Sequence, residues 1–279
     1  MSHPSRLKTF LLVMLAAFAF SLSSVAQAHS SAPESNWSYP STNWPTQYPD
    51  YCLQSNSKVD GVLVQQSPIQ IPYLLTPTST LGPIQFSYEA QKVEVEDNGH
   101  TIEPNFGKGS SDNKVKYGGK TYNLLQFHFH QPNEHTFTNF GGPTMEVHLV
   151  HQAALADGTT DPNGAYLVVG VMMTTGTAKQ GNPMFDTILK NIGKENVDVN
   201  PAGMLPGPSN KYSKLNYFTY TGSLTTPFCN PGVTWLVLAN PITISPDQIR
   251  IFETHYTGIN RLVQAPIQGL ILQKSNIPQ

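Results

Sequence analysis

The 279-residue chain has few charged side chains: lysine, arginine, aspartate and glutamate make up 12% of it, and its formal net charge is −2. It has no basic patch and no run of like charges, which argues against a nucleic-acid partner and a charged interaction tail. After its N-terminal segment, no apolar run approaches the roughly 20 residues that a membrane-spanning helix needs. It also lacks repeats and low-complexity segments. The sequence therefore predicts one domain with a buried core, no nucleic-acid partner and no membrane span in the mature chain.

The N-terminal segment has the three parts of a secretory signal peptide. Arg6 and Lys8 supply positive charge, an apolar stretch follows, and residues 26–28 form an A-x-A cleavage site. We expect a signal peptide at residues 1–28 and a mature catalytic domain at residues 29–279, located in the periplasm or secreted. The alternative is an uncleaved membrane anchor, for which the apolar stretch is short.

Cysteine is scarce, since Cys52 and Cys229 are the only two in the chain. An even number of cysteines in an exported protein favours a disulfide bond. The alternative is a pair of unpaired buried thiols. Neither cysteine has a C-x-x-C neighbour, so we do not expect redox catalysis.

Short runs of β-branched and aromatic residues, separated by glycine, proline and asparagine, dominate the ordered part of the sequence. Residues 29–60 lack such periodicity and predict an irregular arm, in which Trp37, Tyr39 and Trp44 serve packing. Helical spacing occurs at residues 183–192, and Ser245 caps a second short helix. This pattern predicts a mainly β (mixed α/β) single domain with a few short helices. The predicted strands cover residues 84–88, 92–97, 116–122, 165–173, 217–226 and 233–238.

Five of the nine histidines lie between residues 124 and 151, in what we interpret as two antiparallel strands at residues 122–129 and 145–152. Side chains alternate between the two faces of a strand. In the first strand this places on one face Gln126, His128 and His130, and on the other Leu125, Phe127 and Phe129. In the second strand one face carries Glu146, His148 and Val150.

If these strands pair, His128, His130 and His148 converge. Three neutral imidazole nitrogens with an open fourth position are the ligand set of a catalytic zinc ion. Metal-bound histidines usually donate their second N–H to an oxygen acceptor. Gln126 and Glu146 each lie two residues before a histidine and on its face, where they can orient it. A solvated polar face would not explain the apolar opposite face, and we therefore expect zinc.

Other histidines and a competing metal motif need separate interpretations. His151 lies on the face opposite His148, so we expect a structural role for it, as for His135, and a surface position for His255. The spacing His128-x-His130-x3-Glu134 also matches most of the first cupin motif. The glycine that should begin that motif is absent, and the second cupin motif does not fit, which argues against a cupin.

Several longer stretches carry a family resemblance. In order they are QSPIQI at 66–71, NGH at 98–100, LLQFHFH at 124–130, NEHT at 133–136, MEVHLVH at 145–151, LVVGV at 167–171, YTGSLTTPFC at 220–229 and VTWLVL at 233–238. With these stretches the chain resembles the α-class carbonic anhydrases. The resemblance implies a large twisted, mostly antiparallel central sheet with zinc at the bottom of a cone-shaped cleft. It also implies a lyase that hydrates CO2 reversibly to bicarbonate and a proton by attack of zinc-bound hydroxide.

The resemblance further implies roles for individual residues. The zinc ligands would be His128, His130 and His148, oriented by Gln126 and Glu146. Thr225 would accept a hydrogen bond from the hydroxide, Glu134 would receive the threonine's proton, and His100 would be the proton shuttle. The substrate pocket would be lined by Val150, Val168, Leu224, Thr226, Val233 and Trp235. The disulfide of exported family members corresponds to Cys52 and Cys229.

Four positions depart from the family pattern without removing a ligand: Glu103, Gln131, Phe228 and Leu262. We expect them to affect proton transfer, inhibitor preference or stability. The alternatives to an enzyme are a non-catalytic zinc-binding module on the same fold and a zinc-buffering protein. The expected cofactor is Zn²⁺, the expected partners are CO2 and bicarbonate, and the expected quaternary state is a monomer or a homodimer.

Overall fold

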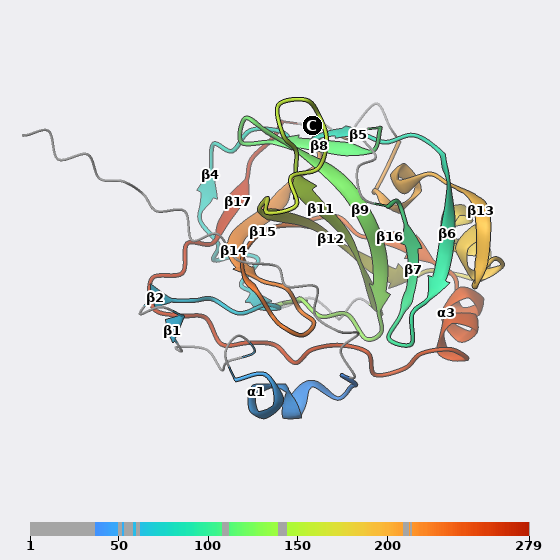
Figure 1. The fold of residues 1–279 in the computed structure, drawn as a ribbon, viewed down its shortest axis with the longest axis horizontal. Coiled ribbons are helices and arrows are strands. Elements are labelled where there is room, and N and C mark those ends of the chain that lie inside the picture. Colours follow the sequence, from blue (N-terminus) through green and yellow to red (C-terminus); the bar gives the residue numbers. More distant parts are fainter. Residues whose placement is uncertain are drawn as a thin grey trace, which may run out of the picture.

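The computed structural model describes residues 37–49, 52, 58–59, 62–107, 112–138, 144–208, 212 and 214–278. The predicted signal peptide and parts of the N-terminal arm lie outside these residues. Within them the chain folds around a thirteen-stranded, mostly antiparallel sheet (Figure 1), which confirms the predicted mainly β class. From edge to edge its main path runs β13 (Lys194–Val199), β6 (Gln91–Asp97), β7 (Ile102–Asn105), β9 (Lys120–His130), β11 (Met145–Ala153), β12 (Tyr166–Thr175), β15 (Pro231–Leu238), β14 (Tyr217–Ser223), β17 (Gln273–Ser275) and β4 (Thr78–Ser79).

Three further strands attach to this path, and two small pairs lie apart from it. Strand β16 (Ile242–Ile244) pairs with β12, while β5 (Gln85–Ser87) pairs with β8 (Lys114–Tyr117), which pairs with β9. The small pairs are β1 (Lys58–Val59) with β2 (Val62–Leu63), and β3 (Gln70–Ile71) with β10 (Thr136–Phe137). The helices are α1 (Trp44–Gln47), α2 (Pro183–Leu189) and α3 (Pro246–Glu253), with 3-10 turns η1 (Ser41–Asn43) and η2 (Pro201–Met204).

The centre of the sheet is covered on both faces, because β11 and β12 are buried along almost their whole length. One face packs against the helices: the Phe129 ring lies 4.8 Å from that of Phe185 in α2 and 6.1 Å from that of Phe252 in α3. The opposite face carries His128, His130 and His148. The sheet thus separates the main hydrophobic core from the polar site, and the core packing sets the positions of the strands that hold the site.

A β-bulge corrects the simple alternation expected for the first histidine strand. The register of β9 against β11 shifts between Val150 and His151, which lie opposite Gln126 and Leu124. The shift turns Leu125 out of the core, and Leu124 joins the core cluster instead. The prediction that Leu125 shares a face with Phe127 was therefore wrong, because one extra residue at a bulge resets the alternation.

Both longer helices begin where the sequence places a cap. The Asn182 side chain accepts hydrogen bonds from the backbone N–H groups at the start of α2. Ser245 and Gln248 form a capping box at the start of α3. None of the helices in the described part of the chain is long and apolar enough to cross a membrane.

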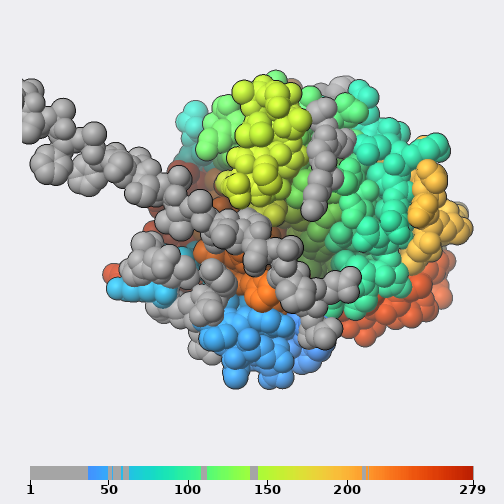
Figure 2. Space-filling model, viewed as in Figure 1, coloured from blue at the N-terminus to red at the C-terminus, as the bar shows by residue number. Residues whose placement is uncertain are grey.

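The N-terminal arm is bonded covalently to the rest of the domain. Cys52 and Cys229 form a disulfide with Cα atoms 4.9 Å apart, which confirms the predicted pairing. The bond is buried beside Trp44. Figure 2 shows the N-terminal segment in blue on the same face of the molecule as the green-blue β6–β7 region.

Candidate functional site

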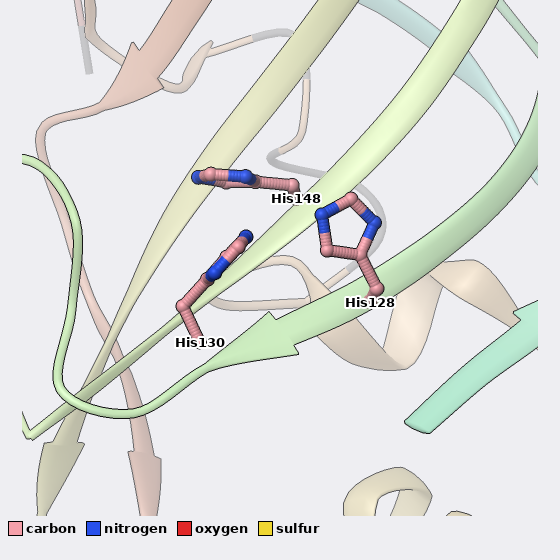
Figure 3. Close-up of side chains that lie close together, drawn as sticks. All are labelled: His128, His130 and His148. Atoms are coloured by element: carbon pink, nitrogen blue, oxygen red, sulfur yellow. The ribbon is translucent and has the colours of Figure 1, made fainter. Parts of the chain in front are cut away.

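Two neighbouring strands bring three histidines together. In the pairing of β9 with β11, His148 lies directly opposite His128, and Glu146 lies opposite His130. The ring centroids are 4.9 Å apart for His128 and His130, 5.5 Å for His128 and His148, and 4.5 Å for His130 and His148. The three rings turn toward one space (Figure 3). A nitrogen of each lies within 4.8 Å of the others, a spacing that suits a shared metal ion.

Each of these rings has its second nitrogen held by an oxygen acceptor. His128 Nδ1 lies 2.8 Å from Gln126 Oε1, and His148 Nε2 lies 2.9 Å from Glu146 Oε1. The acceptor for the third ring is a backbone carbonyl, which no side-chain pattern identifies. His130 Nδ1 lies 2.9 Å from the carbonyl oxygen of Ile259.

These acceptors determine where the protons and lone pairs lie. A nitrogen facing a carbonyl or carboxylate oxygen carries the N–H, so the other ring nitrogen is unprotonated. The unprotonated atoms are Nε2 of His128, Nε2 of His130 and Nδ1 of His148. Burial and repulsion from the neighbouring imidazoles hold the pKa of His128 well below its usual value and lower the pKa of His130 to about 3. These rings are therefore neutral near pH 7.

The donor set fits a zinc ion. His130 Nε2 is buried and has no hydrogen-bond partner in the structure, and such an orphaned lone pair is costly unless a cation or proton donor satisfies it. Three neutral imidazole nitrogens are typical of a catalytic zinc site that keeps one position open. A second group, His135, Glu146 and His148, also has possible ligand atoms within 4.8 Å of one another. There, however, the Glu146 carboxylate already accepts hydrogen bonds from both imidazoles.

Glu146 is fixed from several sides. Its Oε2 accepts the backbone N–H groups of Glu134 and His135 at 2.9 and 2.7 Å. Its Oε1 lies 2.8 Å from His135 Nδ1. Contacts with the imidazoles of His135 and His148 keep its pKa well below the usual range against the effect of burial. Gly170, opposite His148 on β12, leaves room for it, because a Cβ there would lie 2.9 Å from Glu146 Oε1.

A buried polar chain continues behind this carboxylate. His135 Nε2 lies 2.7 Å from the Tyr220 hydroxyl, which donates to Ser67 Oγ at 2.8 Å. The Ser67 carbonyl accepts a hydrogen bond from the Arg261 guanidinium at 2.8 Å. Sequence reasoning missed Tyr220, Ser67 and Arg261 as supporting residues. The only signal was that Ser67 and Tyr220 lie in the quoted family stretches.

Glu134 lies between the metal-binding space and Thr225. Its Oε1 accepts the backbone N–H of Arg261 at 2.6 Å, and its Oε2 lies 3.9 Å from His148 Nδ1. Its Oε2 is buried and has no hydrogen-bond partner in the structure. Burial raises the pKa of Glu134 to about 7, while His148, the Arg261 N–H and the nearby Thr225 side chain oppose the rise.

The residues expected to line an apolar pocket meet in one cluster on the histidine face. It contains Val150, Val168, Val233, Trp235 and, packed at its edge, Leu224. The Trp235 ring lies 4.7 Å from the rings of both His148 and His135. Trp235 is almost wholly buried, whereas Leu224 and Thr226 are partly exposed. The deeply buried members of this cluster therefore lie behind the apolar wall of the site. The partly exposed Leu224 and Thr226 form the surface of that wall.

His100 stands on the turn between β6 and β7 and is stacked on the N-terminal arm. Its ring lies 3.7 Å from that of Trp37, with planes 8° apart. Burial lowers the pKa of His100 below its usual value. The interpretation of Trp37 as a packing residue does not predict this contact with a candidate functional residue. Burial and, second to it, the nearby Glu134 carboxylate raise the pKa of Tyr39.

The departure at Glu103 lies close to this turn. Glu103 Oε2 accepts a hydrogen bond from Asn98 Nδ2 at 3.3 Å, and Glu103 lies opposite Glu96 on β6. Burial and repulsion from Glu96 raise the pKa of Glu103 to about 7. A partly buried carboxyl with this pKa can gain or lose a proton near neutral pH.

The remaining histidines have other partners. His151 is buried on the core side, with Nε2 2.6 Å from the Tyr88 hydroxyl and Nδ1 3.3 Å from the Leu167 carbonyl. His255 is exposed, which confirms the expected surface position. Its Nδ1 lies 3.7 Å from Oδ2 of Asp97, a residue 158 positions earlier in the chain.

Comparisons with known proteins agree with this geometry. The eukaryotic-type carbonic anhydrase family model matches residues 41–268. The chain is 33% identical over 233 residues to a carbonic anhydrase of Pectobacterium carotovorum, covering 80% of this chain and 83% of the relative. It is 35% identical over 211 residues to carbonic anhydrase 7 of Homo sapiens, covering 68% and 76%.

Solved structures give the same result. The α-carbonic anhydrase of Photobacterium profundum superposes with a TM-score of 0.68 at 30% identity, covering 85% of this chain and 99% of that one. That of Thermovibrio ammonificans, solved with the inhibitor sulfanilamide, has a TM-score of 0.65 at 29% identity, covering 85% and 98%. With its sheet, its three inward imidazoles and this similarity along most of its length, the chain belongs to the eukaryotic-type, or α-class, carbonic anhydrases, zinc enzymes that interconvert CO2 and bicarbonate.

Proposed function

We propose that His128, His130 and His148 hold the zinc ion, and that Thr225, Glu134 and His100 assist the reaction of CO2 and water to bicarbonate and a proton. The observation that carries the proposal is the set of three converging ring nitrogens with free lone pairs. The bound zinc supplies Lewis acidity, which makes a nucleophile from water available at neutral pH. All other roles fall to side chains of the protein.

Gln126 and Glu146 keep two of the ligands in the correct orientation and tautomer. Their oxygens hold the N–H of His128 and His148 on the side away from the metal. The Ile259 carbonyl does the same for His130. Because Glu146 is ionised and in contact with His148, it also makes that imidazole a stronger electron donor.

Thr225 and Glu134 orient the attack. When Glu134 accepts the hydroxyl proton of Thr225, the threonine oxygen has only lone pairs left to offer. The threonine oxygen can then accept a hydrogen bond from the nucleophile and hold it in one orientation toward CO2. The backbone N–H of Arg261 fixes the other carboxylate oxygen of Glu134, so the pair is held rigidly.

The apolar wall suits an uncharged substrate. CO2 has no charge and gains little from hydrogen bonds, so valine, leucine and tryptophan side chains offer it a site where water has no good partners. Val150 and Leu224 would meet CO2 directly, with Val168, Val233 and Trp235 behind them. Thr226, partly exposed beside Thr225, would line the polar edge of the same space.

His100 would carry the product proton to buffer. An imidazole changes its charge near neutral pH, so it can accept a proton from the site and release it to solvent. Partial exposure and a place on a turn suit this exchange. The stack on Trp37 gives the ring a defined position outside the buried triad.

The test is CO2 hydration by stopped flow, with zinc content measured on the same samples. We expect one zinc per chain, activity that chelation abolishes and zinc restores, and loss of zinc in His148→Ala. Thr225→Val should retain zinc and lose about 100-fold or more in kcat/KM, the scale expected for a misoriented reactant. Thr144→Val, which alters an exposed hydroxyl, is the matched control.

Two results would contradict the assignment. Full zinc occupancy without CO2 hydration would favour the alternative, a non-catalytic zinc-binding module. Unchanged kcat/KM in Thr225→Val would remove that residue from the mechanism. His100→Ala should lower kcat in dilute buffer, with recovery on addition of imidazole, and unchanged kinetics would exclude the shuttle role.

We further propose that the mature protein acts outside the cytoplasm, in the periplasm or secreted. The Cys52–Cys229 disulfide is typical of oxidising compartments, which supports this location. Expression with the native leader, followed by cell fractionation and N-terminal sequencing, should yield a protein that begins at His29. Light scattering of that product distinguishes a monomer from a homodimer.

A further inference from the structure

The turn that carries His100 is held from outside by the loop after α3. The Tyr256 hydroxyl donates a hydrogen bond to Asp97 Oδ1, at the end of β6. The same Asp97 oxygen accepts the Gly99 backbone N–H at 3.5 Å. Tyr256 is therefore bonded to the carboxylate that holds the backbone directly before His100.

The other side of the turn is attached to the sheet. Asn98 Oδ1 accepts the backbone N–H groups of His100 and Thr101 at 3.0 and 2.9 Å. Thr101 Oγ1 donates to the Phe129 carbonyl at 2.7 Å, between the ligands of β9. The turn is thus held by β9, by the Trp37 ring and by the Tyr256 hydroxyl. The Tyr256 attachment is the one that comes from the loop after α3.

The loop with Tyr256 also contacts the metal-binding space and Glu134. Three residues after Tyr256, Ile259 presents its carbonyl to His130, and Arg261 then donates its backbone N–H to Glu134. One short segment therefore contacts the shuttle turn, a ligand and the Thr225 partner. A shift of this segment would therefore move the His100 turn and the contacts of His130 and Glu134 together.

We propose that Tyr256 and Asp97 are positioning residues for proton transfer: their hydrogen bond sets where the His100 turn stands relative to the zinc site, and hence how fast the product proton leaves. The proposal rests on the proposed shuttle role of His100. It predicts an effect on proton exit alone, since neither residue belongs to the apolar wall or the Thr225–Glu134 pair.

The chemistry of the pair suits a permanent clamp. Burial and the Asp97 carboxylate raise the pKa of Tyr256, so its hydroxyl remains a donor at all working pH values. The Tyr256 ring packs beside Phe252, with centroids 6.3 Å apart. Phenylalanine at position 256 would therefore keep the ring and remove only the hydrogen bond. The His255 ring lies 3.7 Å from the other Asp97 oxygen, so the effect of this neighbour has to be measured separately.

The decisive variant is Tyr256→Phe in the zinc-loaded enzyme. We expect kcat in dilute buffer to fall about 3- to 10-fold, kcat/KM to stay within twofold, and concentrated imidazole buffer to restore kcat. Asp97→Ala should behave alike, whereas Asp97→Asn, which keeps an acceptor oxygen, should retain most of the rate. In zinc-free protein, the amide protons of Gly99 and His100 should exchange faster in Tyr256→Phe by NMR.

Controls make the result specific. Tyr212→Phe removes a hydroxyl that donates to the Ala202 carbonyl, away from the shuttle turn, and should change neither kcat nor exchange. His255→Ala leaves the clamp intact and should match the wild type. If His255→Ala slows proton transfer while Tyr256→Phe does not, the clamp is refuted and a relay through His255 replaces it.

His100→Ala separates failure of the proposal from failure of the shuttle assignment. If His100→Ala loses buffer-dependent turnover and Tyr256→Phe keeps wild-type kcat and amide exchange, the clamp is wrong and the shuttle stands. If His100→Ala is itself unaffected, the shuttle assignment fails and the clamp fails with it. A fall in kcat/KM of Tyr256→Phe equal to the fall in kcat would also overturn the proposal, because it would place the effect on the CO2 step.

Discussion

His135 holds Glu146 by two bonds, one from its backbone N–H to Oε2 at 2.7 Å and one from its ring Nδ1 to Oε1 at 2.8 Å. Glu146 in turn contacts His148, one of the three converging histidines. His135, a loop residue that binds no metal in our assignment, thus holds the carboxylate that orients His148.

Replacing His135 should therefore affect both stability and metal binding. In His135→Leu, the buried Glu146 carboxylate loses the ring N–H of His135 and the Tyr220 hydroxyl loses one hydrogen-bond partner, so we expect destabilisation of about 2–4 kcal/mol. Zinc affinity should fall about 10- to 100-fold, as for other changes behind metal ligands. Urea unfolding of zinc-free protein and chelator competition measure the two effects. Wild-type zinc affinity in a folded variant would contradict the prediction.

Gly170 offers an independent way to disturb the same carboxylate. A methyl group there would lie 2.9 Å from Glu146 Oε1, too close for either atom to stay in place. We expect Gly170→Ala to lower zinc affinity about 10- to 100-fold and stability by about 1–3 kcal/mol. Gly82→Ala, where nothing lies within 4 Å of the added methyl, is the control. Equal zinc affinity in the two variants would show that Glu146 tolerates displacement.

Glu103 should make stability depend on pH. Its folded-state pKa is raised to about 7 from 4.5. Between these values the folded protein keeps a proton that the unfolded chain releases, so stability should decline as pH rises through that window, by up to about 3 kcal/mol. Glu103→Gln cannot titrate and should show a smaller decline. Urea unfolding at pH 5 and pH 8 measures the difference, and identical declines in both proteins would contradict the raised pKa.

Loss of the disulfide should weaken the domain and the segment after Thr225. Cross-linking residues so far apart in sequence contributes about 5 kcal/mol in the chain-entropy model. We therefore expect the Cys52→Ser, Cys229→Ser double variant to unfold about 10 °C or more below the oxidised protein. The kcat/KM of the double variant should also fall. The Cys229 N–H donates to the Thr226 carbonyl at 2.7 Å, so a residue 229 released from the disulfide can displace the segment that follows Thr225. Reductant should lower the unfolding temperature of the wild type and leave the double variant unchanged. Equal unfolding temperatures for the oxidised wild type and the double variant would refute the prediction.

Local pattern in the sequence was enough for the part of the site that lies on two strands. Alternation with a period of two placed His128, His130 and Glu146 on one face, because strand geometry is regular. The same rule failed at Leu125, since a bulge adds a residue that composition does not reveal. The pairing of Glu134 with Thr225 had no local signature, and it was expected only from the family resemblance.

By itself, the sequence determined the mainly β class, the three histidines with two of their acceptors, and the disulfide. The first two depend on residue type and near-neighbour spacing, whereas the disulfide follows from the presence of two cysteines in an exported chain. Only the tertiary structure decided that Ile259 supplies the third acceptor, that Trp37 stacks on His100, and that the Tyr256 hydroxyl donates to Asp97. These contacts join segments far apart in the chain, and one of them uses a backbone carbonyl that every residue possesses. Packing alone selects which of many equivalent groups meet, so no pattern in the sequence could name them.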